Sequence, residues 1–139
     1  MENLRLGEAL DAAARALVEQ LDADACEISR VVGDVLITVA EHAPKGHVLH
    51  LSTGYLVTDF PETRRVLDRR EPRAVRVGAA GADPDEERVL RELGFGALLM
   101  LPLAVRSEPW GLVEVYRADA RAFGAVEIRA ATAILDGIA

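Results

Sequence analysis

The chain has 139 residues, of which 50% are hydrophobic and 28% are charged, and this composition is typical of one folded domain and not of a disordered segment. Its 23 acidic and 16 basic side chains give a net charge of −7, which disfavours binding to nucleic-acid phosphates and to anionic membrane surfaces. We therefore expect a single domain over residues 1–139 that has neither nucleic acid nor a membrane as its partner.

Residues 2–22 carry the first predicted element, an amphipathic helix. Charged residues are spread through this segment, which excludes a signal peptide, and no apolar run in the chain is long enough to span a bilayer. The apolar side chains recur at the three-to-four-residue spacing that gathers them on one helical face: Leu6, Leu10, Ala13, Ala14, Leu17, Val18 and Leu21.

Two stretches rich in Val, Ile and Leu follow at residues 25–32 and 34–42, and the Gly33-Asp34 pair between them predicts a β-hairpin. Cys26 falls on the first of these strands. As the sole cysteine it can form neither an internal disulfide nor a thiolate metal cluster, so the chain suits a reducing compartment and we expect a cytoplasmic location. We interpret Cys26 as a small buried hydrophobic side chain.

Residues 43–60 hold no regular period because proline and glycine interrupt the apolar positions, and we interpret them as a lid-like loop. Three histidines lie within nine residues of one another, just before the loop and in its first half: His42, His47 and His50. Imidazole is a ligand for iron and zinc, so a haem or metal site is one hypothesis. Their spacing matches no helical metal-ligand signature, and solvated loop histidines are the alternative.

Residues 59–70 predict a short helix, because Asp59 and Glu62 have capping-box spacing and a proline is tolerated in the first turn. A short strand at residues 73–77 and a linker follow. A further short helix opens with Asp83 as a cap before Pro84 and ends at Gly94.

Residues 96–105 and 110–117 predict two stronger strands, joined by a turn at residues 106–109. Residues 125–138 predict the last helix, with apolar positions again on one face. This order of elements predicts an α/β protein of the α+β type, in which helices pack on an antiparallel sheet.

Three segments of the chain resemble the GAF domain family. Residues 54–67 with Glu71-Pro72 are similar to the segment around the family's binding pocket, and residues 98–102 with 110–116 are similar to its central hairpin. Phe123 and the helix after it resemble the closing helix of the family. The order and spacing of these segments are more specific than any one of them.

The resemblance implies a five- or six-stranded antiparallel sheet, with the first and last helices on one face and a ligand pocket under loops and short helices on the other. It also implies a sensory or regulatory role beside an attached or separate output domain, because GAF domains occur in signalling proteins. The family's cyclic-nucleotide signature contains Asn-Lys, whereas the sole asparagine here is Asn3. Bilin-binding members attach their chromophore through a cysteine near the pocket, and Cys26 lies elsewhere.

The strand at residues 110–117 offers one pocket candidate, Glu114. Alternation places Glu114 and Tyr116 on one face and Val113 and Val115 on the other, which we expect to meet the terminal helices. A carboxylate in a central strand is costly unless it is hydrogen-bonded or paired, so two interpretations stay open. Glu114 contacts a ligand, or it pairs with an arginine such as Arg64, Arg73 or Arg117.

The lid-like loop offers the other candidates, because its aromatic and hydroxyl groups suit a small-molecule site. The alternative is that its aromatic side chains fill the pocket and complete the core. The sequence does not identify the ligand or cofactor. The predicted pocket between loop and sheet is lined by Tyr55, Thr58, Phe60, Leu99, Leu101, Glu114 and Tyr116.

We therefore predict a sensory or regulatory domain that binds a small molecule or serves as a dimerisation module, and not an enzyme. The serines lie in no nucleophile-elbow context and no phosphate-binding glycine loop is present, so we assign no catalytic residue and no metal ligand. The alternative function is a haem- or metal-dependent redox sensor, or a small enzyme, that uses His42, His47 and His50.

We also predict a homodimer through the helices at residues 2–22 and 125–138. Their apolar stripes extend over more length than one small sheet face covers, so we expect part of them to be exposed on a monomer. Two copies would then bury this surface in a twofold-symmetric four-helix bundle.

Overall fold

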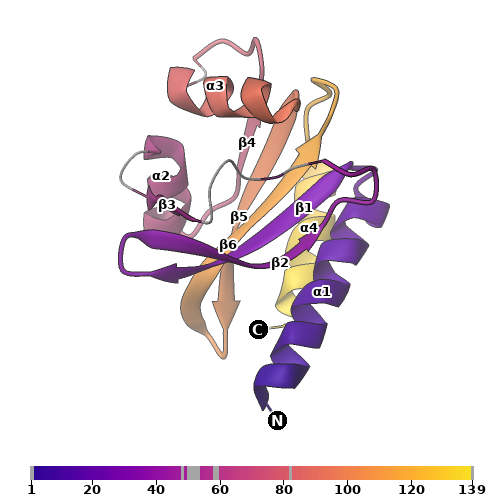
Figure 1. The fold of residues 1–139 in the computed structure, drawn as a ribbon, viewed down its shortest axis with the longest axis vertical. Coiled ribbons are helices and arrows are strands. Elements are labelled where there is room, and N and C mark those ends of the chain that lie inside the picture. Colours follow the sequence, from indigo (N-terminus) through magenta and orange to yellow (C-terminus); the bar gives the residue numbers. More distant parts are fainter. Residues whose placement is uncertain (1, 48, 50–53, 58–59, 82, 139) are drawn as a thin grey trace.

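The computed structural model describes residues 2–47, 49, 54–57, 60–81 and 83–138, and within them it shows a six-stranded sheet with helices on both faces (Figure 1). The predicted antiparallel α+β fold is confirmed, because every adjacent pair of strands is antiparallel. The strand order is β3-β2-β1-β6-β5-β4. The strands are β1 (Ala25–Val32), β2 (Val35–His42), β3 (Gly54–Leu56), β4 (Arg73–Arg76), β5 (Ala97–Val105) and β6 (Glu108–Arg117).

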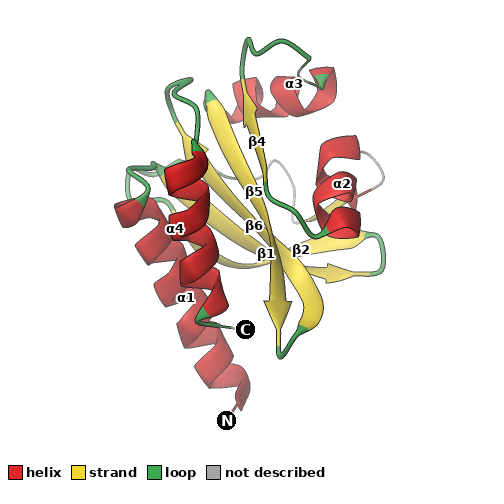
Figure 2. Cartoon of the chain, turned by 180° about the vertical axis from the view of Figure 1, so that it is seen from behind, coloured by secondary structure: helices red, strands yellow, loops and turns green. Residues whose placement is uncertain are grey.

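One face of the sheet, here called the helix face, is covered by α1 (Glu2–Gln20) and α4 (Ala125–Asp136), which lie side by side (Figure 2). The apolar stripe of α1 packs against this face. Leu10, Leu17 and Leu21 are buried there and Leu6 is partly buried, so little of the stripe that was expected to be partly exposed is open to solvent. The stripe is covered by β1 and β2 and by the neighbouring α4. No helix in the described ranges has the length and apolarity needed to cross a membrane.

The other face, here called the lid face, is covered by α2 (Pro61–Arg69), α3 (Pro84–Leu93) and the described parts of the loop at residues 43–60 (Figure 1). The sequence analysis missed β3, which lies within this loop and pairs with β2. A strand of three residues is too short for alternation to reveal it. The buried apolar side chains of the lid face are Ala25, Leu36, Leu49, Val57, Val66, Val75, Leu90, Phe95, Leu98, Met100, Leu112 and Tyr116.

The two short helices begin in different ways. The Asp83 carboxylate caps α3 by accepting hydrogen bonds from the backbone N–H groups of Asp85 and Glu86, at 2.9 and 3.1 Å, as predicted. Helix α2 instead begins at Pro61 after Phe60, which supplies no side-chain cap. The predicted capping residue Asp59 lies outside the described residues.

An exposed apolar area remains on the helix face of the sheet, beside α1. Val32, Val35, Ile37 and Leu56, here called the sheet patch, are between 37% and 51% exposed. Their cross-strand partners place them on the face opposite the buried Leu36. The exposed apolar surface that was expected on the terminal helices is therefore found mainly on the sheet.

The buried guanidinium of Arg117 joins the end of β6 to both terminal helices. It lies 4.1 Å from the centre of the Phe123 ring and 3.6 Å from the Glu127 carboxylate in the first turn of α4. Its N–H groups, at 2.6 to 3.3 Å, donate to the backbone carbonyl oxygens of Leu21, Asp22, Arg121 and Ala122. One cation thus satisfies the carbonyl groups just beyond α1 and those of the loop that leads into α4.

Replacement of this guanidinium should destabilise the fold. Arg117→Met leaves several of these carbonyl groups without a donor and should lower the free energy of unfolding by roughly 3 kcal/mol or more. Arg121→Met is the matched control, because the exposed Arg121 pairs with Asp22 at the surface and its loss should cost less than about 1 kcal/mol. Urea unfolding followed by circular dichroism measures both variants. Equal losses in the two variants would contradict the central role of Arg117.

Candidate ligand-binding site

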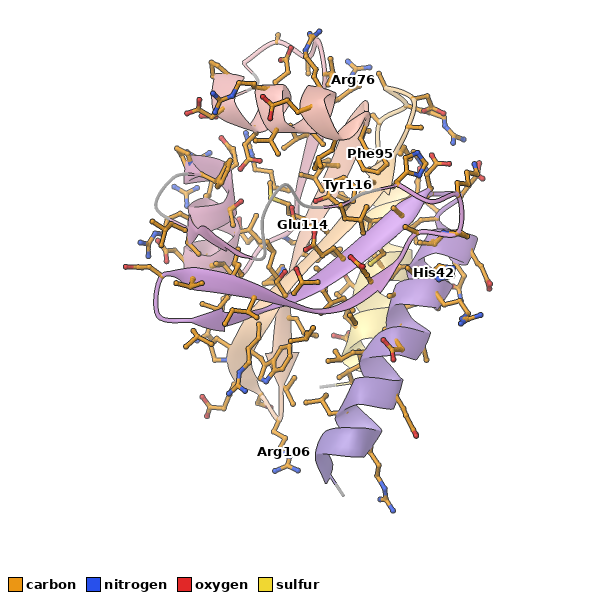
Figure 3. The ribbon with its side chains drawn as sticks, viewed as in Figure 1. His42, Arg76, Phe95, Arg106, Glu114 and Tyr116 are labelled. Carbon is orange, nitrogen blue, oxygen red and sulfur yellow. The ribbon has the colours of Figure 1, made fainter. Side chains whose placement is uncertain are left out.

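Strand β6 places Glu114 on the lid face. Val113 and Val115 pack in the helix-face core while Tyr116 lies in the lid-face core, so the alternation predicted for this strand is confirmed. Glu114 is only 6% exposed, and its Oε2 accepts a hydrogen bond of 3.1 Å from the Tyr116 hydroxyl (Figure 3). The central strand therefore holds a buried carboxyl group against a tyrosine.

A second buried carboxyl group, which the sequence analysis missed, lies directly across from Glu114. The register pairs Glu27 of β1 with Glu114 of β6 on one side and with Glu41 of β2 on the other. Glu27 is 1% exposed, and the Thr38 hydroxyl donates to its Oε1. The sequence offered one signal for this, because Glu27 lies two residues after the apolar Ala25 and so shares its face of the strand. A glutamate in a predicted hairpin, however, is more often on the solvent side.

Helix α3 brings a third buried carboxyl group to this face. Glu86 is 5% exposed, and its Oε1 accepts a hydrogen bond of 3.1 Å from the Thr63 hydroxyl of α2. Burial, reinforced by the nearby Glu114, raises the pKa of Glu86 to about 7. Burial also raises the pKa of Glu27 to about 7, although the hydrogen bond from Thr38 acts in the opposite direction. The lid face is thus a site where carboxyl groups titrate near neutral pH.

A row of rings connects these carboxyl groups with the loop at residues 43–60. The Tyr116 ring stacks on Phe95 with centroids 4.7 Å apart, and Phe95 contacts His47 at 4.8 Å. Phe95 follows Gly94, whose left-handed backbone ends α3 and turns the chain back towards the sheet. The Nδ1 atom of His47 is buried and has no hydrogen-bond partner among the residues that the structure describes. This ring therefore adds a polar atom beside the site.

Two of the predicted lining residues lie on the wrong face. The register pairs Met100 with Glu114, so Leu98 and Met100 face the lid, and Leu99 and Leu101 pack in the helix-face core. The prediction that Leu99 and Leu101 line the pocket with Glu114 is therefore wrong. Nearly every side chain of β5 is apolar, and a continuous apolar run does not reveal which positions face which side.

The loop residues are described only in part. Phe60, just before α2, is half-buried. The backbone of Tyr55 in β3 pairs with that of Leu36 in β2. The side chain of Tyr55 and the whole of Thr58 lie outside the described residues. Their predicted contact with a ligand stays a prediction.

The arginines proposed as partners of Glu114 are engaged elsewhere. Arg64 lies 3.2 Å from the Asp34 carboxylate, and Arg73 pairs with Glu62. Arg117 points away from the lid face towards the terminal helices. The Tyr116 hydroxyl donates to Glu114, whereas these three guanidinium groups pair with other residues.

The described histidines, His42 and His47, do not assemble into one centre with the cysteine. His42 lies opposite Cys26 at the end of β2 on the helix face, whereas His47 stacks on the lid-face side, and His50 is not among the described residues. Within the described ranges, no three His, Cys, Asp or Glu side chains are grouped so that they could hold a metal ion. Cys26 is fully buried in the helix-face core, as predicted, and burial raises the pKa of its thiol.

Comparison with known proteins agrees with this architecture. The model of the GAF domain family matches residues 5–139. No functionally curated protein matches the sequence. Solved structures show the same fold at low sequence identity.

The phycoerythrobilin-bound GAF domain of a cyanobacterial phytochrome has a TM-score of 0.83 and 19% identity, over 99% of this chain and 84% of that chain. The blue-light-absorbing form of the PixJ GAF domain of Thermosynechococcus elongatus has a TM-score of 0.79 and 20% identity, over 96% and 82% of the two chains. The chromophore-binding domain of a bacteriophytochrome from R. palustris has a TM-score of 0.77 and 16% identity, over 96% of this chain and 53% of that chain.

The buried carboxyl groups predict a fall in stability as the pH rises. A group with a pKa of about 7 when folded and 4.5 when unfolded binds more protons in the folded state between these values, so the free energy of unfolding decreases from pH 4.5 to 7. Glu86→Gln cannot ionise and should lose less stability over this window, by roughly 2 kcal/mol. Urea unfolding at a series of pH values measures this difference.

Glu92→Gln is the control for that experiment, since Glu92 is exposed on the same helix and should leave the wild-type slope unchanged. Glu127 does not interfere, because backbone hydrogen bonds at the start of α4 lower its pKa below 4.5. The pH range from about 5 to 7 lies between the unfolded and the folded pKa of Glu86. A wild-type free energy of unfolding that is constant or increases over this range would refute the burial of an ionisable Glu86.

Proposed function

This chain is a member of the GAF domain family, and on that premise we propose that it is a sensory or regulatory domain that binds a small molecule on its lid face. The observation that carries the proposal is the placement of Glu27, Glu86 and Glu114 as buried carboxyl groups on one face of the sheet. Buried carboxyl groups destabilise the fold unless donors reach them. Each of these groups accepts a hydrogen bond from a hydroxyl group, and a carboxylate has further acceptor positions that a ligand with N–H or O–H groups would use.

The chemistry of this face favours a donor-rich ligand over an anion. Carboxylates accept hydrogen bonds and repel negative charge, and the aromatic rings of Phe95 and Tyr116 offer a flat apolar surface beside them. A planar molecule that carries N–H groups fits this combination. Such a molecule would be held without a covalent bond, because the sole cysteine, Cys26, is buried on the opposite face.

We propose a binding role for these groups, and not a catalytic one. Each described buried carboxyl group already accepts a hydrogen bond from Thr38, Thr63 or Tyr116, and we assign none of them a reacting substrate. A reducing compartment such as the cytoplasm suits the buried thiol.

We further propose that the domain signals as a homodimer through α1 and α4. The inner stripe of α1 is buried in the monomer, so the contact would use the outer surfaces of the two helices, where Ala12 and Val126 are exposed. Val126 is 69% exposed. Arg117 links the strand that carries Glu114 to the end of α1 and the start of α4, which gives a ligand-induced shift a physical route to the dimer contact.

Ligand retention tests the lid-face site. Native mass spectrometry of freshly purified wild-type protein should show a small-molecule mass in addition to the 15.0 kDa polypeptide. Glu114→Gln removes a charge-assisted acceptor and should lower the occupancy roughly tenfold. Glu108→Gln, on the exposed start of the same strand, should retain the molecule. A wild-type protein that carries only its polypeptide mass, or a Glu114→Gln protein as fully occupied as wild type, contradicts the proposal.

Sedimentation velocity tests the dimer. Wild type should sediment as a dimer at micromolar concentration, and the double variant Ala12→Arg/Val126→Lys should sediment as a monomer, because two added cations would face their symmetry mates. Ile37→Lys, in the sheet patch, should remain dimeric. If Ile37→Lys alone dissociates the dimer, the interface is the sheet patch, and a wild type that stays monomeric at high micromolar concentration excludes both arrangements.

A further inference from the structure

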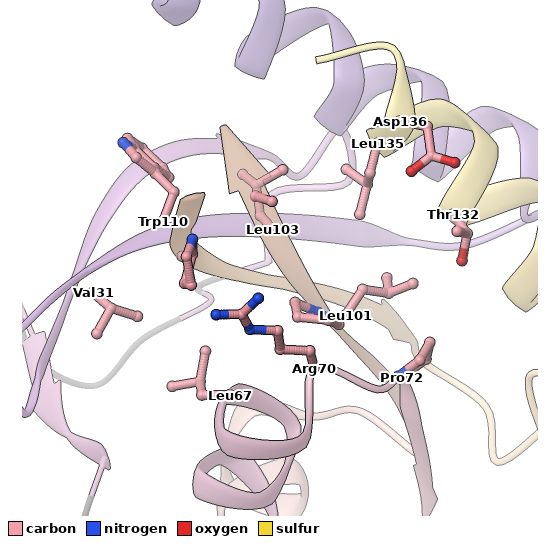
Figure 4. Close-up of a pocket in the computed structure, with 14 residues that line it drawn as sticks. Val31, Leu67, Arg70, Pro72, Leu101, Leu103, Trp110, Thr132, Leu135 and Asp136 are labelled. Carbon is pink, nitrogen blue, oxygen red and sulfur yellow. The ribbon is translucent and has the colours of Figure 1, made fainter. Parts of the chain in front are cut away.

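A hollow of about 400 Å³ lies at an edge of the sheet, away from the buried carboxyl groups (Figure 4). It exists because β5 is longer than its neighbour β4, which pairs only with residues 97–100. Beyond Met100, β5 continues beside β6 with no described strand on its other side. Pro102 lies in this stretch, where a residue without an N–H group is tolerated. The ends of α2 and α4 flank the opening.

The walls of this hollow are mostly apolar. The side chains of Leu67, Leu101, Leu103, Trp110 and Leu135 line it, and they come from α2, β5, β6 and α4. None of Glu27, Glu86, Glu114 or Tyr116 is among its lining residues. The hollow is therefore separate from the lid-face site.

The polar lining includes one cation, Arg70. Its guanidinium extends over the hollow between Leu67 and Leu101 (Figure 4). Arg70 ends α2 in a left-handed conformation, with φ 55° and ψ 42°, a backbone region that is costly for a residue with a side chain. Whereas Arg64 and Arg73 are paired with Asp34 and Glu62, Arg70 makes no hydrogen bond or ion pair with any residue that the structure describes.

We propose that this hollow is a second ligand site, which binds a small apolar carboxylate whose chain or ring fills the hollow and whose carboxylate pairs with Arg70. A guanidinium presents two parallel N–H donors that match the two oxygens of a carboxylate. The volume lies at the lower end of the range for small-molecule sites. A dianion such as a phosphate ester is disfavoured, because one cation leaves a charge unbalanced and Asp136 lies on the same lining.

Trp110 makes this proposal directly measurable. It is the sole tryptophan of the chain and it lines the hollow, so its fluorescence reports binding here independently of the lid-face site. Octanoate should change the fluorescence of the wild-type protein in a saturable manner. Octylammonium and octyl phosphate, which share the chain but differ in charge, should bind at least tenfold more weakly.

Variants of neighbouring arginines provide the matched pair. Arg70→Gln should weaken octanoate binding at least tenfold, and Arg70→Lys, which keeps the charge but loses the paired donors, should lie between Arg70→Gln and wild type. Arg69→Gln alters an exposed arginine that does not line the hollow and should stay within twofold of wild type. Circular dichroism verifies that each variant is folded. The proposal is overturned if octanoate gives no saturable change in the fluorescence of the wild-type protein. It is also overturned if Arg70→Gln binds octanoate as tightly as wild type does, or if wild type binds octyl phosphate as tightly as octanoate.

Discussion

The buried guanidinium of Arg117 connects parts of the chain that are almost a hundred residues apart in sequence. Its donors satisfy carbonyl groups at Leu21 and Asp22, beyond α1, and at Ala122, before α4. The Phe123 ring packs against it and Glu127 balances its charge. Because Arg117 is also the residue after Tyr116 on β6, the same short segment fixes the terminal helices and positions the tyrosine of the lid face. The two sides of the sheet therefore depend on a common strand end.

The two faces of the sheet differ in the kinds of side chain that they bury. The helix face buries mainly apolar side chains, and its buried Arg117 guanidinium donates to backbone carbonyl groups. The lid face combines apolar side chains with Glu27, Glu86 and Glu114, which are desolvated and must be satisfied by hydroxyl donors. Both faces bury an apolar cluster, and the carboxyl groups with a raised pKa, Glu27 and Glu86, lie on the lid face.

The hollow and the sheet patch lie where strands extend past a neighbouring element. Where β5 extends past β4, the sheet leaves an apolar hollow, and the charged residues in its described lining are Arg70 and Asp136. Where β1, β2 and β3 extend past α1, the sheet leaves apolar side chains such as Ile37 exposed. In both places apolar surface stays open because no described strand or helix covers it.

The sequence by itself determined the order and type of nearly all elements, since caps such as Asp83, terminators such as Gly94 and the alternation around Glu114 are local signals. It also placed Cys26 in the core. It could not decide which face Leu99 and Leu101 occupy, because an all-apolar strand has no alternation and its phase comes from the pairing of Met100 with Glu114. Nor could it find that Glu27, Glu86 and Glu114 share one face, or that Arg70 overhangs a hollow. Those groupings depend on strand register and on how far each element extends, and only the tertiary structure decides both.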